Sequence, residues 1–210
     1  MTHEGKEELI DYRIAPSEAQ EHWQDFLTRL EARGLRRTPG EEKTLRLLVS
    51  DGDGGLEAAR LMVYPGVPHQ LCVFHKLQAI AGHLRQRDNR TAIMAEAAAI
   101  YRELRSVPQA LKRLQQWRRR WLSVEPEAVR CFCGDFERTL VYLSLPEGDR
   151  ARAKTNNPVE RFIRELNRKI RQVGVLPSYQ SWDRFTYLTW HYLKDGGYPN
   201  SAKHHFTHNS

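Results

Sequence analysis

The stretch Ser50–Leu56 reads Ser-Asp-Gly-Asp-Gly-Gly-Leu and follows a compact apolar run at residues 45–49. Such a run is typical of a buried strand, which the glycines then end. In α/β proteins the carboxyl ends of strands open into the crevice where ligands bind. Asp51 is therefore a candidate site residue, whereas Asp53, two residues further on in the turn, is the weaker candidate. The alternative for Asp51 is an ordinary turn or helix-capping aspartate.

Strand and helix patterns alternate around this stretch. They predict strands at residues 9–14, 45–49 and 67–74, and helices at residues 17–34 and 56–63. Ser17 and Gln20 fit a capping box at the start of the first helix. This order indicates an α/β layer.

The middle of the chain, from Lys76 to about Arg138, has a helical pattern without a clear strand. One amphipathic helix there carries the cations Lys112, Arg113, Arg118, Arg119 and Arg120. This run is either a solvated face or a phosphate-contacting surface. We expect residues 1–75 and 146–193 to form two halves of one core, residues 76–145 a helical insertion, and residues 194–210 a flexible tail. The polar stretch 146–152 is expected to be a flexible loop at the boundary.

A second candidate carboxylate is Glu160. Asn157 and Pro158 fit the N-cap and first position of a helix, so on local grounds Glu160 is a capping-box glutamate. The same helix carries Arg161, Arg164, Arg168, Lys169 and Arg171. Two carboxylates brought together on one fold can hold Mg²⁺ or Mn²⁺, and a cationic stripe beside them suits a DNA backbone.

The three cysteines give a weaker signal. Cys72 and His75 stand in a Cys-x-x-His element, and with Cys131 and Cys133 they could form a zinc site. A Cys-x-Cys spacing is unusual for a closed tetrahedral site, so we expect Cys72 and His75 to organise the candidate site instead. An odd number of cysteines also argues against a disulfide framework and fits a reducing cytosol.

The net charge of the chain indicates what kind of partner it binds. The 210 residues carry a formal net charge of +7, which favours a polyanion such as nucleic acid. The sequence has no apolar run of about 18 residues and no charged-then-apolar leader. We therefore expect a cytoplasmic, nucleoid-associated protein with no membrane partner.

Taken in order, these motifs resemble the catalytic region of the Mutator-like transposases and their bacterial insertion-sequence relatives. The resemblance covers about residues 5–193 and rests on the helix ending Arg33-Gly34-Leu35, Asp51 with Gly55-Leu56, Gln70 with Cys72-x-x-His75, and Thr155-Asn156-Asn157-x-x-Glu160-Arg161 before a basic helix running to Ser181. It implies an α/β, ribonuclease-H-like core interrupted by an all-helical insertion between the second and third catalytic acids.

On this resemblance, Asp51 corresponds to the second acid and Glu160 to the third, each binding Mg²⁺ or Mn²⁺. The implied reaction is DDE-type transposition, in which water cuts at the transposon end and the freed 3′-hydroxyl attacks target DNA. Two metals would activate the nucleophile and stabilise the leaving oxygen. The implied partners are DNA at the transposon ends and target, and further copies of the chain or a full-length transposase.

One part of the family pattern has no counterpart here. The first acid of the family lies on the first strand, well upstream of the helix at 17–34, but only the strand at 9–14 is predicted before that helix. We therefore expect a core without its first two strands, belonging to a truncated transposase that is inactive alone. Asp11 is the only carboxylate on that strand and a candidate substitute. The alternative is a non-catalytic DNA-binding or regulatory protein derived from a transposase.

Overall fold

The structure, a computed structural model, describes residues 8–35 and 45–194. The chain forms two units, one of residues 1–16 with 157–210 and one of residues 17–156. Each is described by itself below. The four parts expected from the sequence divide the chain differently, and their boundaries stay a prediction; residues 195–210 of the expected tail lie outside the described residues.

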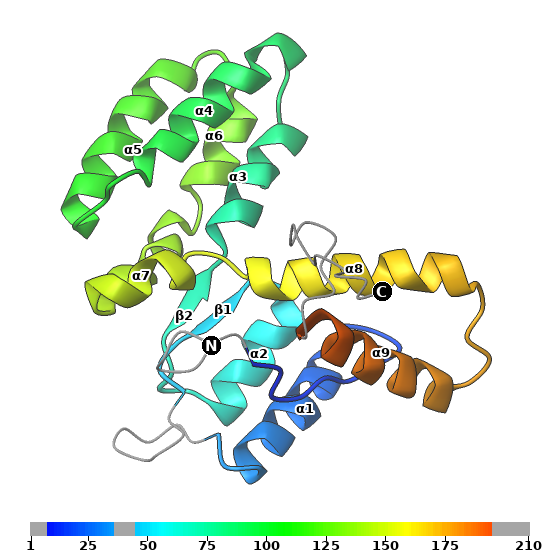
Figure 1. Cartoon of the computed structure of the whole chain (residues 1–210). Coiled ribbons are helices and arrows are strands. Elements are labelled where there is room, and N and C mark those ends of the chain that lie inside the picture. Colours follow the sequence, from blue (N-terminus) through cyan, green and yellow to red (C-terminus); the bar gives the residue numbers. More distant parts are fainter. Residues whose placement is uncertain (1–7, 36–44, 195–210) are drawn as a thin grey trace, which may run out of the picture. The chain divides into compact units, whose positions relative to one another are not determined.

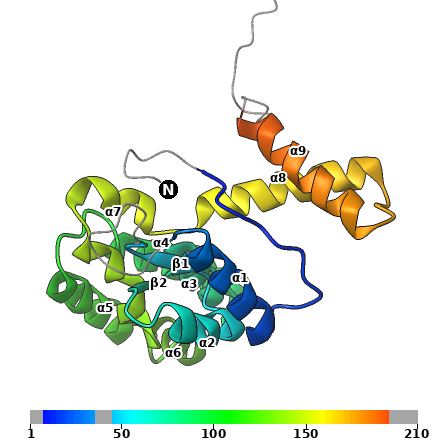
Figure 2. The ribbon, with the colours of Figure 1, turned by 90° about the horizontal axis from the view of Figure 1, so that it is seen from below.

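The unit 17–156 begins with a small α/β layer. Its elements are α1 (Gln20–Ala32), β1 (Leu48–Ser50), α2 (Gly54–Val63) and β2 (His69–Leu71). The strands pair in parallel, with Leu48 opposite His69 and Ser50 opposite Leu71. Helices α1 and α2 lie side by side (Figure 2) around a core of Leu27, Leu30, Leu56, Ala59, Val63, Tyr64 and Val67. Both predicted helices are confirmed, whereas the strands are shorter than predicted.

Two glycines allow this layer to form. A Cβ at Gly55 would lie 2.2 Å from the carbonyl oxygen of Glu18, so only glycine lets the chain before α1 cross the first turn of α2 so closely. Gly52, in the turn after β1, has a φ of +100°, a conformation that L side chains rarely adopt. The glycines that end the apolar run therefore set the path of the chain at Asp51.

A helical part follows in the same unit. It comprises α3 (Val73–Gly82), η1 (Arg87–Asn89), α4 (Arg90–Ile100), α5 (Val107–Trp121), α6 (Pro126–Cys133), η2 (Phe136–Thr139), η3 (Val141–Ser144) and α7 (Glu147–Ala153). Helices α3 to α6 pack together (Figure 1) over an aromatic core that includes Tyr101, Trp117, Phe132 and Phe136. The predicted all-helical pattern is confirmed.

Buried hydrogen bonds of Gln70 join β2 to the end of the helical part. The Gln70 amide is fully buried; its Nε2 donates to the carbonyl oxygen of Thr139 at 2.8 Å, and its Oε1 accepts from the Tyr142 N–H at 2.9 Å. The Thr139 hydroxyl in turn pairs with the Tyr101 hydroxyl at 2.8 Å. Because a buried amide is stable only when its groups are paired, this contact fixes η2 and η3 against the sheet.

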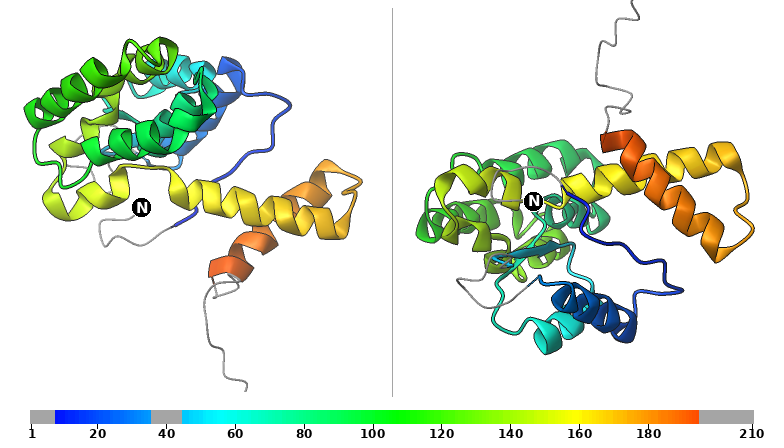
Figure 3. Two further views of the ribbon diagram at one scale, coloured as in Figure 1. Left: turned by 90° about the horizontal axis from the view of Figure 1, so that it is seen from above. Right: turned by 60° about the horizontal axis from the view of Figure 1, so that its bottom comes forward.

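The other unit contains a helical hairpin, α8 (Asn157–Val173) and α9 (Tyr179–Lys194), visible in both views of Figure 3. The rings of Phe162 and Trp190 meet edge to face, 5.4 Å apart, and hold the two helices together. The N–H of Gly174 donates to the carbonyl oxygen of Ile170 and closes the last turn of α8. The predicted continuation of the basic helix to Ser181 is therefore wrong.

Two predictions near the start of the chain are also wrong. Residues 8–15 form no strand in the structure. An alternation of apolar and polar residues does not make a strand unless a second strand pairs with its backbone. In this segment the Tyr12 N–H donates to Oδ1 of its neighbour Asp11. Helix α1 is capped at Ala19 without a side-chain cap, so the capping box of Ser17 and Gln20 does not form.

Two further predictions fail at segment boundaries. The stretch 146–152, expected as a flexible loop, forms helix α7, whose acids occupy the first turn and whose arginines occupy the last, as the helix dipole favours. The strand predicted at 67–74 ends at Leu71, since Cys72 caps α3. His75 thus lies on a helix instead of at a strand end. Within the described residues the fold is mixed α/β, mostly helical, with one two-stranded parallel sheet.

Candidate metal and nucleic-acid site

Asp51 lies immediately after β1, at the carboxyl end of the parallel pair. The residue is exposed, and no hydrogen bond or ion pair holds its carboxylate among the described residues. The capping role that could have explained an aspartate here belongs to Asp53, whose Oδ1 accepts the Leu56 N–H at 2.8 Å at the start of α2. Asp51 is therefore available for a ligand, whereas Asp53 has a structural role.

The predicted site-organising residues lie on α3. Cys72 is 1% exposed, and its N–H donates to the carbonyl oxygen of Ser50 at 2.7 Å, next to Asp51 in the chain. His75 is half-buried in the first turn of α3, with its ring 5.8 Å from that of Phe74. Cys72 therefore borders the Asp51 turn through its backbone, while the role of His75 stays a prediction.

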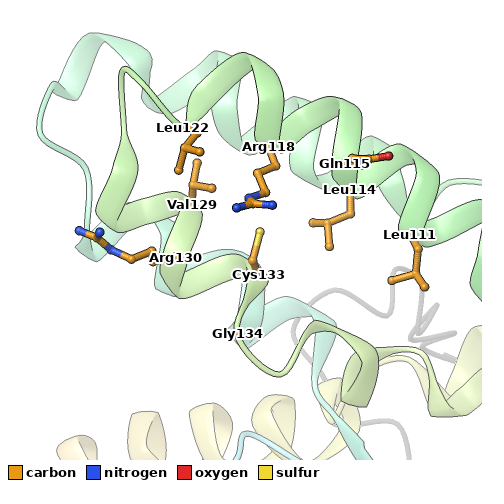
Figure 4. Close-up of a pocket in the computed structure, with 9 residues that line it drawn as sticks. All are labelled: Leu111, Leu114, Gln115, Arg118, Leu122, Val129, Arg130, Cys133 and Gly134. Atoms are coloured by element: carbon orange, nitrogen blue, oxygen red, sulfur yellow. The ribbon is translucent and has the colours of Figure 1, made fainter.

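The zinc alternative finds no support in the structure. Cys131 and Cys133 are on α6, and no group of three or more histidine, cysteine or acidic residues gathers among the described residues in a way that could hold a metal. Cys133 instead faces Arg118 across a groove of about 400 Å³ between α5 and α6 (Figure 4). Burial raises the pKa of the Cys133 thiol, which disfavours the thiolate that zinc requires.

The sequence does not predict a partly buried polar network that lies next to Asp51. Ser50 Oγ lies 2.8 Å from His69 Nε2, and His69 Nδ1 lies 2.6 Å from Glu57 Oε2. Arg60 and Arg138 also contact the Glu57 carboxylate, each at 2.9 Å. The parallel register could have indicated it, because Ser50 and His69 are diagonal neighbours on the same face.

The surroundings lower the pKa values of both titrating groups in this network, Glu57 and His69, for different reasons. The hydrogen bonds from Arg60 lower the pKa of Glu57 to about 2 against the effect of burial, with His69 and Arg138 adding to the shift. Burial lowers the pKa of His69 despite the adjacent Glu57 carboxylate. Near neutral pH the network therefore consists of a carboxylate, a neutral imidazole and two guanidinium groups.

The second candidate acid, Glu160, is half-buried in the first turn of α8. Along this helix Arg161, Arg164 and Arg171 are exposed. Two other cations have additional contacts: Arg168 pairs with Glu165 at 2.8 Å, and the Lys169 ammonium lies 3.9 Å from the ring centre of Tyr192. Because Asp51 and Glu160 belong to different units, their meeting at one metal stays a prediction.

The cationic run on α5 divides into two groups. Arg113 Nη1 donates to the carbonyl oxygens of Ile100 and Arg102 at the end of α4, and Arg120 pairs with Glu96 at 3.1 Å. The other three, Lys112, Arg118 and Arg119, are exposed. Part of the run is therefore structural, and the remaining charges fit both a solvated face and a phosphate-contacting surface.

The described residues thus define an α/β protein with an available carboxylate at a strand end and cationic helices in both units. The model of the Mutator family of transposases matches residues 1–196, and the chain belongs to this family. No helix among the described residues combines the length and apolar character needed to cross a bilayer.

Individual relatives agree with the family model. The transposase of insertion sequence IS406 from Burkholderia multivorans is 33% identical over 83% of this chain and 43% of its own length. That of IS1201 from Lactobacillus helveticus is 30% identical over 86% of this chain and 47% of its own length. The ISRM5 transposase from Rhizobium meliloti is 29% identical over 85% of this chain and 42% of its own length. The chain therefore spans less than half the length of these relatives.

Proposed function

We propose that the chain is the catalytic-region part of a DDE-type transposase, contributing two acids, Asp51 and Glu160, to metal-dependent cleavage and joining of DNA. The observation that carries this proposal is the exposed Asp51 carboxylate at the end of β1, with the local capping role taken by Asp53. Membership of a transposase family supports it. A ribonuclease-H-like core is part of the same proposal, supported by the parallel β1–β2 pair.

The donor set fits a hard divalent cation. Carboxylate oxygens are the ligands that Mg²⁺ prefers, and Asp51 has no partner to displace among the described residues. Mg²⁺ or Mn²⁺ held by Asp51 and Glu160 would supply positive charge to the phosphoryl oxygens of DNA. The exposed arginines of α8 follow Glu160 on the same helix and would hold the DNA backbone beside it.

The proposed activity has a limit within these 210 residues. Among the described residues no third acid, as the family pattern requires, is identified, and Asp11 lies outside any strand. We therefore propose that the 210-residue polypeptide binds DNA but does not cut it alone. A non-catalytic DNA-binding or regulatory role is the second candidate, because it requires the cationic helices without the acids.

A shared metal site predicts that the two carboxylates lie within about 8 Å of each other, because ions ~4 Å apart must contact both. Fe²⁺ substituted for Mg²⁺, with ascorbate and peroxide, would then cut the backbone near residues 51 and 160 in one reaction. We expect Asp51→Asn to abolish both cuts. Asp53→Asn is the matched control, since asparagine still caps α2, and it should leave both cuts in place. Cuts at only one position would reject the shared site.

The DNA-binding role of α8 predicts a change in salt dependence. Replacing Arg164 and Arg168 by alanine should weaken binding to any duplex and reduce the slope of log K against log salt by about 0.9 for each phosphate that the variant no longer neutralises. Fluorescence anisotropy over a salt series measures both quantities. The matched control removes two exposed charges outside both cationic helices, in Arg87→Ala with Arg105→Ala. Equal effects in the two double variants would show a response to net charge instead of a specific α8 surface.

A further inference from the structure

Ser50, the last residue of β1, is linked through His69 and Glu57 to the guanidinium groups of Arg60 and Arg138. Ser50 and His69 lie diagonally on one face of the parallel strands, which brings Ser50 Oγ within 2.8 Å of His69 Nε2. The other ring nitrogen, Nδ1, lies 2.6 Å from Glu57 Oε2 on α2. Ser50 and His69 are both buried, at 6% and 7% exposure, so the contact between them is shielded from water, whereas Glu57 is partly exposed.

The chemistry of the partners assigns the direction of these hydrogen bonds. The Glu57 carboxylate only accepts, so His69 Nδ1 carries the proton and donates to it. In the neutral imidazole Nε2 is then the acceptor, and the Ser50 hydroxyl donates to it. This leaves a Ser50 Oγ lone pair for the Gly52 N–H, 3.3 Å away. Arg138 Nη2, although 2.9 Å from Nδ1, therefore bonds the carboxylate and not the ring.

These contacts hold the peptide groups on both sides of Asp51. Before it, the carbonyl oxygen of Ser50 accepts the Cys72 N–H at 2.7 Å. After it, the N–H of Gly52 is held by Ser50 Oγ. The orientation of the Ser50 hydroxyl depends on His69, whose ring is fixed in turn by Glu57. The backbone at Asp51 is thus fixed while its own side chain stays exposed.

We propose that Ser50 is a positioning residue for Asp51, and that the Glu57–His69 pair orients the Ser50 hydroxyl for this purpose. The proposal rests on the proposed function, in which Asp51 is a metal ligand. A rigid turn lowers the entropy cost when the Asp51 carboxylate binds a cation. Mutating a residue that supports a metal ligand without touching the metal typically weakens metal affinity about 10–100-fold.

The same connectivity of carboxylate, imidazole and hydroxyl occurs in serine hydrolases. Here the hydroxyl of Ser50 is buried and already accepts the Gly52 N–H, so it has no position from which to attack a substrate. The arrangement therefore serves to hold the turn and not to form a covalent intermediate.

The test compares Ser50→Thr with Ser50→Val in the 210-residue chain. The two side chains have nearly the same shape and both suit a strand, but only threonine keeps the hydroxyl. Mn²⁺ affinity, measured by electron paramagnetic resonance, should be near wild type in the threonine variant and about tenfold weaker in the valine variant. Hydrogen exchange of the Gly52 amide, followed by NMR, should be about tenfold faster in the valine variant only.

The outcomes separate this inference from the proposed function. Equal Mn²⁺ affinity and equal Gly52 exchange in the two folded variants would overturn the positioning role. Faster Gly52 exchange together with wild-type Mn²⁺ binding that Asp51→Asn does not change would reject the metal function, and with it Ser50 as a positioning residue for a metal ligand. If the valine variant does not fold, Ser50→Ala takes its place, because it removes the hydroxyl without adding volume.

Discussion

Replacing Glu125 by alanine is expected to lower the free energy of unfolding by about 2–4 kcal/mol, since three donors are deprived of their acceptor together. The Glu125 side chain is fully buried between α5 and α6. Its carboxylate accepts the backbone N–H groups of Arg85 at 2.7 Å and Gln86 at 3.1 Å, and Asn89 Nδ2 at 2.8 Å. It thereby ties the connection between α3 and α4 to the start of α6.

The expected loss of unfolding free energy depends on whether water can reach the three donors that lose their acceptor. A buried donor left without an acceptor costs about 1–3 kcal/mol, and the three would sum to more than we expect. Arg85 and Gln86 are themselves exposed, so water can reach part of the space that alanine leaves. A change of this size corresponds to a fall in Tm of roughly 5–15 °C for a domain of about 150 residues. Urea and thermal melts followed by circular dichroism would measure it.

The control lies two residues further on, in the first turn of α6. Glu127 is exposed and forms a surface ion pair with Arg130, so Glu127→Ala should change stability little. Comparable destabilisation in the two variants would contradict the role given to Glu125. In a third variant, Glu125→Gln, one acceptor is kept and an NH₂ group faces the donors, so an intermediate effect is expected.

The effect of Glu125 should also depend on pH. Burial raises the pKa of its carboxyl, but the hydrogen bonds from Asn89, Arg85 and Gln86 outweigh burial and lower it. A carboxyl whose pKa is lower in the folded than in the unfolded state stabilises the fold fully above the ordinary value of about 4.3. This contribution disappears as the pH falls through the folded pKa. The difference between wild type and Glu125→Ala should therefore shrink in acid.

Helices were the most predictable part of this fold. The patterns of α1, α2 and α5 are long enough for their apolar period to appear in the sequence. Strand length was less predictable, because it depends on backbone pairing with a neighbouring strand and not on composition. Strands β1 and β2 pair at three positions. Helix α7 was missed because its signal is electrostatic, with acids in the first turn and arginines in the last.

The candidate site was predictable to a similar extent. The position of Asp51 at a strand end follows from a general rule and was predictable, whereas its role at a metal stays a prediction. His69 could not be selected in this way, since its contact with Ser50, 19 residues earlier, arises only when β1 and β2 pair in parallel. Glu57 could not be selected either, because it joins the network through His69. The buried role of Glu125 depends likewise on a connection about 40 residues away in sequence.

The 210-residue polypeptide is expected to bind DNA but not to cut or join it with Mg²⁺ or Mn²⁺. Phosphoryl transfer needs metal charge placed by several carboxylates, and two acids leave the ions loosely held. Asp11 is a weak substitute for a third acid, because it lies outside any strand and its Oδ1 already accepts the Tyr12 N–H. A plasmid that carries the ends of the element, incubated with the chain with and without EDTA, provides the nicking assay.

Joining these residues to an upstream segment that supplies a further strand bearing an aspartate should be necessary for cleavage. In the joined protein we expect Asp51→Asn and Glu160→Gln each to reduce cutting by more than about 100-fold, since removing a partner behind a ligand alone costs 10–100-fold. Asp53→Asn, which keeps the cap of α2, should cut normally. Metal-dependent cutting by the 210-residue chain alone that disappears in Asp11→Asn would make Asp11 the first acid. In that case residues 9–14 would have to pair as a strand when DNA and metal bind, because only a strand of the core would hold that carboxylate beside Asp51.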